Sequence, residues 1–131
     1  MTKNNLINVK NLSVSFGDNI ILNNINLHLS KKESLVIIGK SGSGKSVLLK
    51  CLMGLLKPNL GSIEINGIDI LKTNRIDKEN ALKNIGVTFQ NGALFDSLTV
   101  WENITFKETR FFGFNKKLAK ERALSIIQNL E

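Results

Sequence analysis

Residues 39–46 read Gly39-Lys40-Ser41-Gly42-Ser43-Gly44-Lys45-Ser46 and match the pattern G-x-x-x-x-G-K-[ST] in full. The pattern predicts a phosphate-binding loop, or P-loop, because glycines let the backbone turn tightly and bring its N–H groups close to phosphate oxygens. Lys45 then supplies a positive charge for the outer phosphates of ATP, and the Ser46 hydroxyl can ligate Mg²⁺. The rival dinucleotide pattern G-x-G-x-x-G fails, since position 47 is valine. The predicted nucleotide-binding residues of this segment are Gly39, Lys40, Ser41, Gly42, Ser43, Gly44, Lys45, Ser46 and Val47.

The sequence on either side of the loop fits a strand, a loop and a helix in that order. Leu35-Val36-Ile37-Ile38 is an unbroken apolar run, which predicts a strand over residues 34–38 that is buried on both faces. Residues 45–56 predict a helix, and Pro58 and Gly61 follow it as stop signals. A helix that begins at the loop adds its positive N-terminal dipole to the site.

Alternating apolar residues predict β-hairpins elsewhere in the chain. Residues 6–16 and 20–29 both alternate and are separated by the turn cluster Gly17-Asp18-Asn19, so we expect an antiparallel pair. Asn66-Gly67, within a second such stretch, is the strongest two-residue hairpin signal.

The later part of the chain is predicted to be largely helical. Thr99 and Glu102 fit a capping box, which predicts a short helix that starts at this point. Apolar residues at helical spacing predict an amphipathic helix over residues 116–130. Three segments precede these in order: a short helix over 77–84, a strand over 85–89 and a loop over 90–98.

Composition sets broad limits on the class of protein. The 131 residues suit one domain, and no stretch approaches the ~20 apolar residues of a membrane span. The polar start, Met1 to Asn5, lacks a signal-peptide core, so we expect a cytoplasmic location. The net charge of +7 comes from scattered residues that are not interleaved with aromatic ones, and no nucleic-acid partner is expected. The single cysteine, Cys51, is expected to be a buried structural residue.

Motifs around the P-loop narrow the class further. A hairpin strand ending in Phe16 precedes it, and Leu52-Met53-Gly54-Leu55-Leu56-Lys57-Pro58 and Gly86-Val87-Thr88-Phe89-Gln90 follow it. From about Val9 to Glu131, this succession resembles the N-terminal half of ABC transporter ATP-binding subunits. The resemblance implies an α/β fold: a P-loop NTPase (RecA-like) core with an N-terminal antiparallel β-subdomain and the start of a helical subdomain. Residues 6–90 would form the nucleotide-binding core and residues 91–131 the start of the helical subdomain.

The resemblance also implies further site residues and partners. Phe16 matches the aromatic residue that stacks on adenine, although a strand-end core aromatic is the alternative. Gln90 matches the Q-loop glutamine, which senses Mg²⁺ and the attacking water. Lys45 and Gln90 are then the implied catalytic residues, and Ser46 and Gln90 the implied metal ligands. The implied partners are a transmembrane permease and a second ATP-binding subunit in a homodimer, which places the chain peripherally at the cytoplasmic face of the inner membrane.

A narrower resemblance concerns residues 90–104, which look like the same loop of the Mla-type phospholipid-transport ATPases. Gly92-Ala93-Leu94-Phe95 is the distinctive part. It implies phospholipid transport across the envelope. Leu94, Phe95 and Trp101 would face the coupling helices of a permease or pack in the core, and the residues alone leave both open.

Several family motifs have no match within residues 1–131. We find no signature motif, no apolar strand ending in Asp-Glu and no switch histidine, and the one histidine, His28, is expected to be an exposed strand residue. We therefore expect a truncated product that binds Mg-ATP weakly and turns it over negligibly. Two alternatives stay open: a non-catalytic nucleotide-binding module that pairs with another protein, and another P-loop enzyme such as a small kinase.

Overall fold

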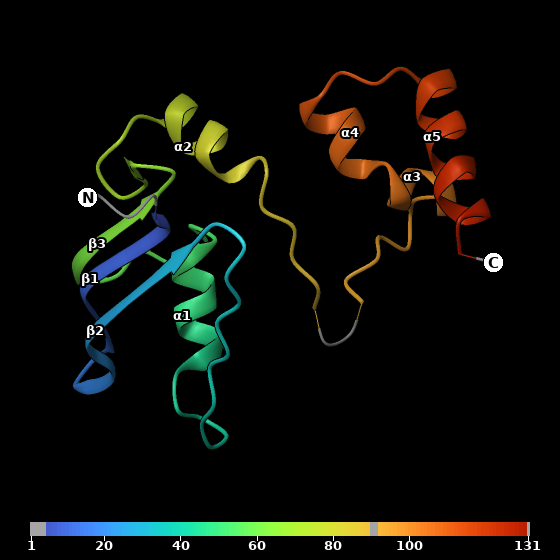
Figure 1. Ribbon diagram of the computed structural model, residues 1–131. Helices are drawn as coiled ribbons and strands as arrows, with labels where there is room; N and C mark the ends of the chain where they lie inside the picture. The colour runs from blue at the N-terminus through green and yellow to red at the C-terminus, as the bar shows by residue number, and fades with distance from the viewer. Residues whose placement is uncertain (1–4, 90–91, 131) are drawn as a thin grey trace. The chain divides into compact units, whose positions relative to one another are not determined.

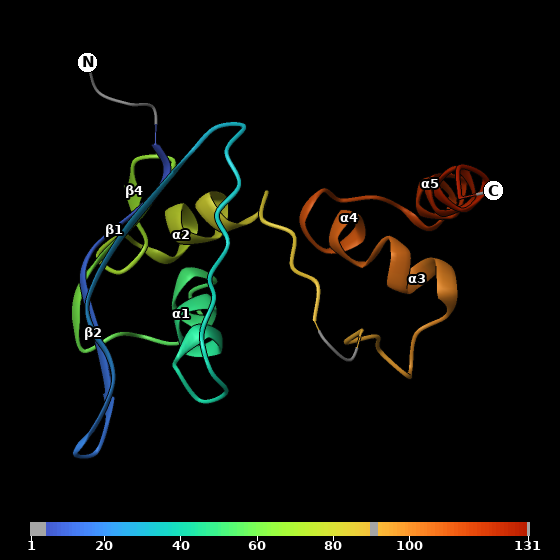
Figure 2. The ribbon, with the colours of Figure 1, turned by 60° about the horizontal axis from the view of Figure 1, so that its bottom comes forward.

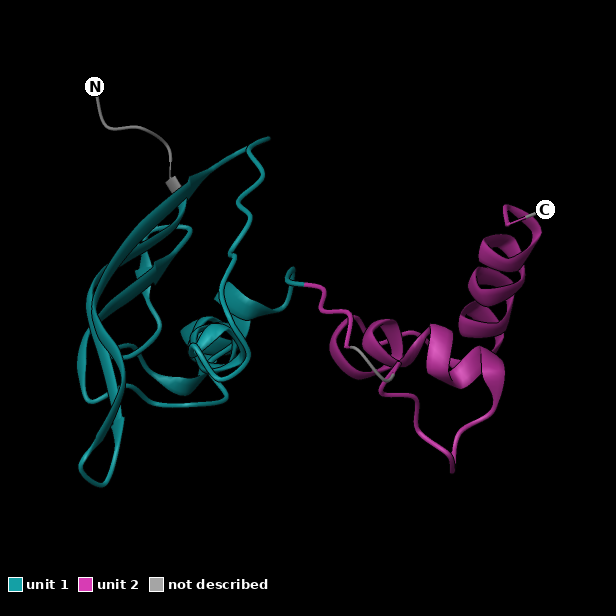
Figure 3. Ribbon diagram, turned by 90° about the horizontal axis from the view of Figure 1, so that it is seen from below, with its two compact units in different colours: residues 1–85 teal, residues 86–131 magenta. Residues whose placement is uncertain are grey.

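The computed structural model describes residues 5–89 and 92–130. The chain divides into two compact units, residues 1–85 and residues 86–131 (Figure 3). The sequence placed the corresponding boundary between residues 90 and 91.

Unit 1 is built on a four-stranded antiparallel sheet (Figure 1). β1 (Asn5–Phe16) lies between β2 (Asn19–Ser30) and β3 (Leu60–Ile65), and β4 (Ile68–Asp69) follows β3 at one edge. The pairing of β1 with β2 confirms the hairpin predicted over residues 6–29.

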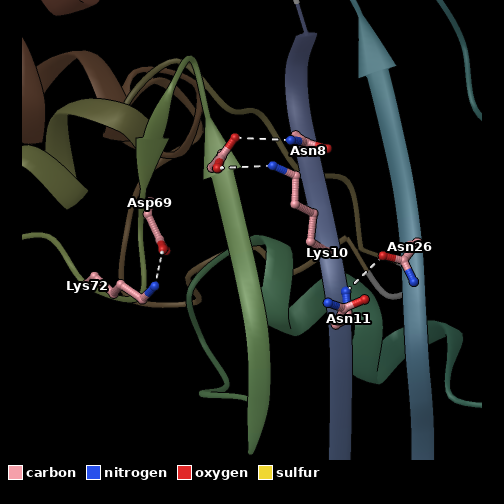
Figure 4. A network of polar contacts seen from close by, with 7 residues as sticks. Asn8, Lys10, Asn11, Asn26, Asp69 and Lys72 are labelled. Atoms are coloured by element: carbon pink, nitrogen blue, oxygen red, sulfur yellow. Dashed lines mark hydrogen bonds and ion pairs between the residues drawn. The ribbon is translucent and has the colours of Figure 1, made fainter.

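An irregularity in β1 keeps its apolar side chains on the core side. The register shifts between Val9 and Leu12, where Asn11 adopts a left-handed φ of 51°. The Asn11 N–H donates to Asn26 Oδ1 at 2.9 Å instead of to a ladder carbonyl (Figure 4). A bulge of this kind changes the face to which the following residues point. Val9, Leu12 and Val14 are all buried as a result.

Polar contacts link the strands on the exposed side of the sheet (Figure 4). Asn8 lies opposite Glu64 in the register of β1 and β3, and Asn8 Nδ2 donates to the Glu64 carboxylate at 3.1 Å. Lys10 Nζ lies 3.8 Å from the same carboxylate, and Lys72 pairs with Asp69 at 3.6 Å. Such exposed pairs stabilise a sheet only slightly, but the contacts of Glu64 with Asn8 and Lys10 favour this register of β1 and β3 over a shifted one.

The turn between β3 and β4 has the predicted hairpin geometry. Asn66 and Gly67 have φ values of 51° and 80°. Both are left-handed, as the favoured two-residue hairpin turn requires.

Helices α1 (Lys45–Leu52) and α2 (Arg75–Leu82) cover one face of this sheet (Figure 2). Leu48 and Cys51 of α1 and Ala81 of α2 join the buried sheet residues in one apolar core. The prediction that Cys51 is buried is confirmed, and burial raises the pKa of its thiol. Apolar burial of this kind is the main force that holds the layer of helices against the sheet.

The two helices differ from their predicted bounds for identifiable reasons. α1 ends at Leu52 rather than at residue 56, because Gly54 adopts a φ of 67° and turns the chain out of the helix before Pro58. α2 begins at Arg75 rather than at residue 77, because the Asn74 side chain caps it by accepting the Asp77 N–H at 2.9 Å.

Two predicted strands are absent from the sheet. Residues 34–38 and 85–89 run without regular secondary structure, so these two predictions are wrong. Val36 is 77% exposed and Ile38 90% exposed. An extended segment becomes a strand only when a neighbour accepts and donates its ladder hydrogen bonds. In residues 5–89 and 92–130, the sheet consists of β1 to β4 and offers these segments no pairing.

Unit 2 contains α3 (Val100–Ile104), α4 (Phe106–Phe111) and α5 (Lys116–Gln128). The capping box is confirmed: the Thr99 N–H donates to the Glu102 carboxylate at 2.8 Å and the Thr99 hydroxyl donates to it at 2.5 Å. α5 begins where the sequence predicted and ends at Gln128 rather than at residue 130. α4 was not predicted. Of the helices that the structure describes, none combines the length and the apolar character needed to cross a membrane.

Candidate phosphate-binding site

The loop of residues 39–44 is joined to the sheet through Gly44, the residue that caps α1. Gly44 is buried and has a φ of 89°. A Cβ atom built on it would lie 2.8 Å from Leu22 Cδ2 and 3.1 Å from the Ile21 carbonyl oxygen. Only glycine therefore fits, for its conformation and for the space left by β2. This close approach positions the start of α1 against the sheet.

A tight turn forms the tip of the loop. The Ser43 N–H donates to the Lys40 carbonyl at 3.2 Å, and Gly42 has a φ of 77°. A left-handed residue at the third position of such a turn favours glycine. Gly42 and Gly44 thus both adopt the left-handed conformation that lets the loop turn tightly.

The Lys45 side chain folds back across this loop. Its ammonium group donates to the carbonyl oxygens of Gly39 and Lys40, both at 2.7 Å, and to Ser43 Oγ at 3.3 Å. An ammonium group has three N–H donors, so each has a partner within the loop. The positive charge is therefore held at the centre of the segment that the motif predicts to bind phosphate.

The first turn of α1 adds to the positive character of the site. The N–H groups of Lys45, Ser46 and Val47 lie in the first turn, where a helix has no acceptor of its own for them. No acidic side chain lies in this turn, and Ser46 is exposed. The helix dipole and these N–H groups together favour an anion at this end.

Nothing in the described residues resembles an all-protein metal centre. Over residues 5–89 and 92–130, no group of three or more His, Cys, Asp or Glu side chains gathers closely enough to hold a metal ion. Ser46 is nevertheless placed to contribute one hydroxyl. A magnesium ion bound with a nucleotide takes most of its ligands from phosphate oxygens and water, so one hydroxyl from the protein fits that arrangement.

The two predicted site residues outside the loop are Phe16, which the structure describes, and Gln90. Phe16 is the last residue of β1, opposite Asn19 in the hairpin, and is 51% exposed. Its ring is accessible to a ligand, and its stacking role stays a prediction. Gln90 lies outside the described residues.

Sequence reasoning missed the residues that support the loop. Ile21 and Leu22 belong to β2, and only the folded chain brings them to Gly44. The partners of Lys45 were missed as well, because two of them are backbone carbonyls, which leave no trace in the pattern of side chains.

Unit 2 carries a second candidate surface, an open hollow of about 440 Å³. Asn103 organises the segment around it. The Asn103 amide donates to the carbonyls of Phe95, Leu98 and Thr99, each at 3.1 Å, and its Oδ1 accepts the Phe95 N–H at 2.9 Å. The lining residues of the hollow are Leu94, Phe95, Asp96, Leu98, Val100, Asn103 and Ile104.

The three side chains singled out in this region have different surroundings. Leu94 is 73% exposed, whereas Phe95 packs on Phe106 with ring centroids 4.5 Å apart. Trp101 is partly buried, and the Lys120 ammonium lies 5.4 Å from its ring centre. Phe95 and Trp101 thus take part in contacts within the chain, whereas Leu94 is mostly exposed.

Comparison with known proteins shows a family match over most of the chain. The model of the family described as ABC transporter matches residues 22–131. The chain is 40% identical over 128 residues to the arginine transport ATP-binding protein ArtM of Bacillus subtilis. That alignment covers 95% of this chain and 52% of ArtM. The chain is also 40% identical over 102 residues to the intermembrane phospholipid transport system ATP-binding protein MlaF of Haemophilus influenzae, covering 78% of this chain and 39% of that protein. The chain thus spans about half the length of the curated relatives it matches.

A solved structure of an ATP-binding cassette has a similar fold. A dimeric ATP-binding cassette in a post-hydrolysis state, bound to ADP and Pi, superposes with a TM-score of 0.78 at 28% sequence identity. The match covers 93% of this chain and 56% of that chain. The predicted fold class, a P-loop NTPase with an N-terminal antiparallel β-subdomain, is confirmed at this level, although the two core strands named above do not form.

Proposed function

Because the chain belongs to the ABC transporter family, we propose that it is the N-terminal part of an ATP-binding subunit and that residues 39–47 hold the phosphates of ATP. The observation that carries this proposal is the loop itself. Lys45 lies across a glycine-rich turn, and this turn leads directly into the first turn of α1, whose N–H groups have no acceptor within the helix. A lysine charge, backbone N–H groups and a helix dipole are the three features that bind a nucleotide's phosphates.

Each site residue has a specific role in this proposal. Lys45 contacts the outer phosphates, and Ser46 offers its hydroxyl to the Mg²⁺ ion that accompanies ATP. Phe16 stacks on adenine, for which its exposed ring is suited. Gln90 senses the metal and the attacking water.

We propose that the 131 residues alone bind Mg-ATP but turn it over negligibly. Phosphoryl transfer depends on positioning and charge stabilisation by several groups acting together. Residues 1–131 include no signature motif and no strand ending in Asp-Glu, so the general base and the opposing clamp are not among them. A non-catalytic nucleotide-binding module is the alternative that the same observation supports. An ATPase assay distinguishes them when the chain is supplied with the missing half of a relative's cassette, because only a catalytic subunit then gains turnover.

The test of nucleotide binding is a calorimetric titration of the chain with Mg-ATP. We expect Lys45→Ala to weaken binding by about 10- to 100-fold, the usual effect of losing a charged hydrogen bond. Lys50→Ala is the matched control, because it removes the same charge from an exposed position on the same helix. Equal binding by the parent and Lys45→Ala, or an equal loss in both variants, would falsify the proposed site.

The proposed partners are a second ATP-binding subunit, in a homodimer, and a transmembrane permease. Two observations support them: matched cassettes of known structure are dimeric, and the hollow beside Leu94 offers an exposed apolar surface. Attachment to a permease would hold the subunit peripherally at the cytoplasmic face of the inner membrane.

For the cargo, we propose phospholipid. The support is the Mla-like stretch at residues 92–95 and the 40% identity to the phospholipid-system relative. Relatives named for arginine and methionine transport are also 40% identical, so identity alone does not select a cargo. ATPase activity of the reconstituted transporter should respond to phospholipid and not to arginine or methionine. A response to either amino acid alone would overturn this assignment.

A further inference from the structure

We propose that Asn59 is a positioning residue for Phe16: it holds the end of β1 so that the Phe16 ring keeps the place at which it stacks on adenine. This inference rests on the proposed function, because the base that the ring meets belongs to the proposed nucleotide. Asn59 lies outside the predicted site residues and acts through the backbone of β1. Its effect is therefore on the binding of the base and not on that of the phosphates.

The end of β1 has sheet support on one side only. β1 pairs with β2 as far as Phe16, which lies opposite Asn19. Over the residues that the structure describes, the register of β1 with β3 ends where Ser13 lies opposite Leu60. Beyond Ser13, β1 and β2 thus form a two-stranded ribbon, which is marginally stable by itself in water. Phe16 is the last residue of β1 and is 51% exposed, so packing holds its ring only in part.

Asn59 supports the end of β1 on its other side. The Asn59 N–H donates to the Ser13 carbonyl at 3.0 Å, and the Ser15 N–H donates to Asn59 Oδ1 at 2.8 Å. One residue thus binds β1 at two points, and the second point directly precedes Phe16 in the chain. The Asn59 amide takes the part that a backbone carbonyl of β3 has along the paired section of β1.

The backbone around Asn59 is itself held in place on both sides. Pro58, before it, is buried, and its ring restricts the backbone. Gly61, after it, lies so close to β1 that an added Cβ would be 2.7 Å from Leu12 Cα. The Asn59 side chain therefore extends from a fixed backbone, and shortening it releases Ser15 without releasing the loop.

A ring that is held in one position binds a base more tightly than a ring that moves. The apparent affinity of a site falls with the share of chains that have the binding geometry. Loss of the Asn59 side chain lowers that share for Phe16, and it removes none of the hydrogen bonds of Lys45 in the P-loop. One hydrogen bond of this kind changes the balance by about two- to ten-fold.

The first experiment measures the contact without any ligand, by NMR-detected amide hydrogen exchange of the full chain. We expect Asn59→Ala to speed exchange of the Ser15 N–H by about two- to ten-fold. Asn59→Asp keeps an acceptor oxygen and should retain the parent rate. Asn26→Ala is the matched control, because Asn26 Oδ1 accepts the Asn11 N–H at 2.9 Å in the same strand (Figure 4). It should speed exchange at Asn11 and not at Ser15.

The second experiment compares the binding of Mg-ATP with that of Mg-tripolyphosphate, which carries the phosphates without a base. We expect Asn59→Ala to lower the preference for ATP by about two- to ten-fold and to leave tripolyphosphate binding at the parent value. Asn59→Asp and Asn26→Ala should keep the parent's preference. In a Phe16→Ala background, Asn59→Ala should change the preference no further, because the ring that it positions is gone.

The outcomes separate this proposal from the proposed function. An unchanged preference in Asn59→Ala overturns the role of Asn59, and so does an equal loss of ATP and tripolyphosphate binding. A full effect of Asn59→Ala in the Phe16→Ala background overturns it as well. If the parent binds tripolyphosphate and ATP equally, the phosphate site stands, and stacking by Phe16 is overturned together with its positioning. If the parent binds neither ligand, the proposed function itself is overturned, and the role of Asn59 with it.

Discussion

Two apolar extended segments of unit 1, strand β3 and residues 34–38, have opposite surroundings in the structure. β3 pairs with β1, and its Ile63 and Ile65 are almost completely buried. The second segment contains four consecutive apolar residues, yet all are exposed to some degree and Ile38 reaches 90%. Apolar composition therefore does not make a strand without a hydrogen-bonding neighbour and a covering layer.

The difference follows from what each sequence pattern requires. β1, β2 and β3 are apolar mainly on one face, which α1 and α2 cover. Residues 35–38 are apolar on both faces, the pattern of a strand that needs neighbours and a covering layer on each side. Within the described ranges, 5–89 and 92–130, the sheet supplies neither.

The largest expected effect is on the free energy of unfolding, when one isoleucine is replaced by alanine in β3 and one in residues 34–38. Ile63→Ala should lower the free energy of unfolding by about 2–5 kcal/mol, because it leaves a cavity in the core. Ile38→Ala should change it by less than about 0.5 kcal/mol, because the side chain is already in solvent. Urea denaturation of both variants makes the comparison. A similar loss in the two would mean that residues 34–38 are buried in solution.

Two glycines, one in β3 and one in a segment without regular structure, extend the comparison to the backbone. Gly61 in β3 has a φ of 100°, and an added Cβ would lie 2.6 Å from the Lys10 carbonyl oxygen and 2.7 Å from that of Asn11. We expect Gly61→Ala to destabilise the chain by about 1–3 kcal/mol. Gly86, in the irregular segment 85–89, has open space around it, so Gly86→Ala should stay within about 0.5 kcal/mol of the parent. Thermal melts of the two variants test this, and a neutral Gly61→Ala would show that β1 and β3 separate easily.

The smallest effect concerns a local motif that needs no partner from another segment. Two hydrogen bonds to the Glu102 carboxylate lower the pKa of Glu102 below its ordinary value. The Thr99 hydroxyl has the larger effect, and the Thr99 N–H has the smaller one. A group whose folded-state pKa is lowered stabilises the fold above its ordinary pKa, and this contribution is lost as the pH falls through the lowered value. We expect Thr99→Ala to bring the pKa of Glu102 back toward its ordinary value, as measured by NMR titration.

A control variant completes this prediction. Glu102→Gln should remove the corresponding acid-induced loss of helix content in circular dichroism, because the amide does not titrate. An unchanged acid transition in Glu102→Gln would contradict the assignment to this carboxylate.

The predictions from sequence succeeded where the signal was local. Thr99 with Glu102, and Asn66 with Gly67, each define a cap or turn through residues adjacent in the chain, and the structure confirms both. The P-loop pattern likewise required glycine at position 44, where the backbone is left-handed. The bounds of α1 were less accurate, because the conformation of Gly54 ended the helix before the stronger stop signal at Pro58.

The sequence by itself determined the hairpins, the Thr99–Glu102 capping box, the phosphate-binding motif and the family resemblance, because each depends on residues close together in the chain or on a fixed spacing. Only the tertiary structure decided which apolar segments become strands, how β2 restricts Gly44, and that the Lys45 ammonium donates hydrogen bonds to the backbone of its own loop. These features depend on backbone groups and distant neighbours. A ladder hydrogen bond, a close backbone approach or a carbonyl acceptor has no side-chain pattern from which it could be read.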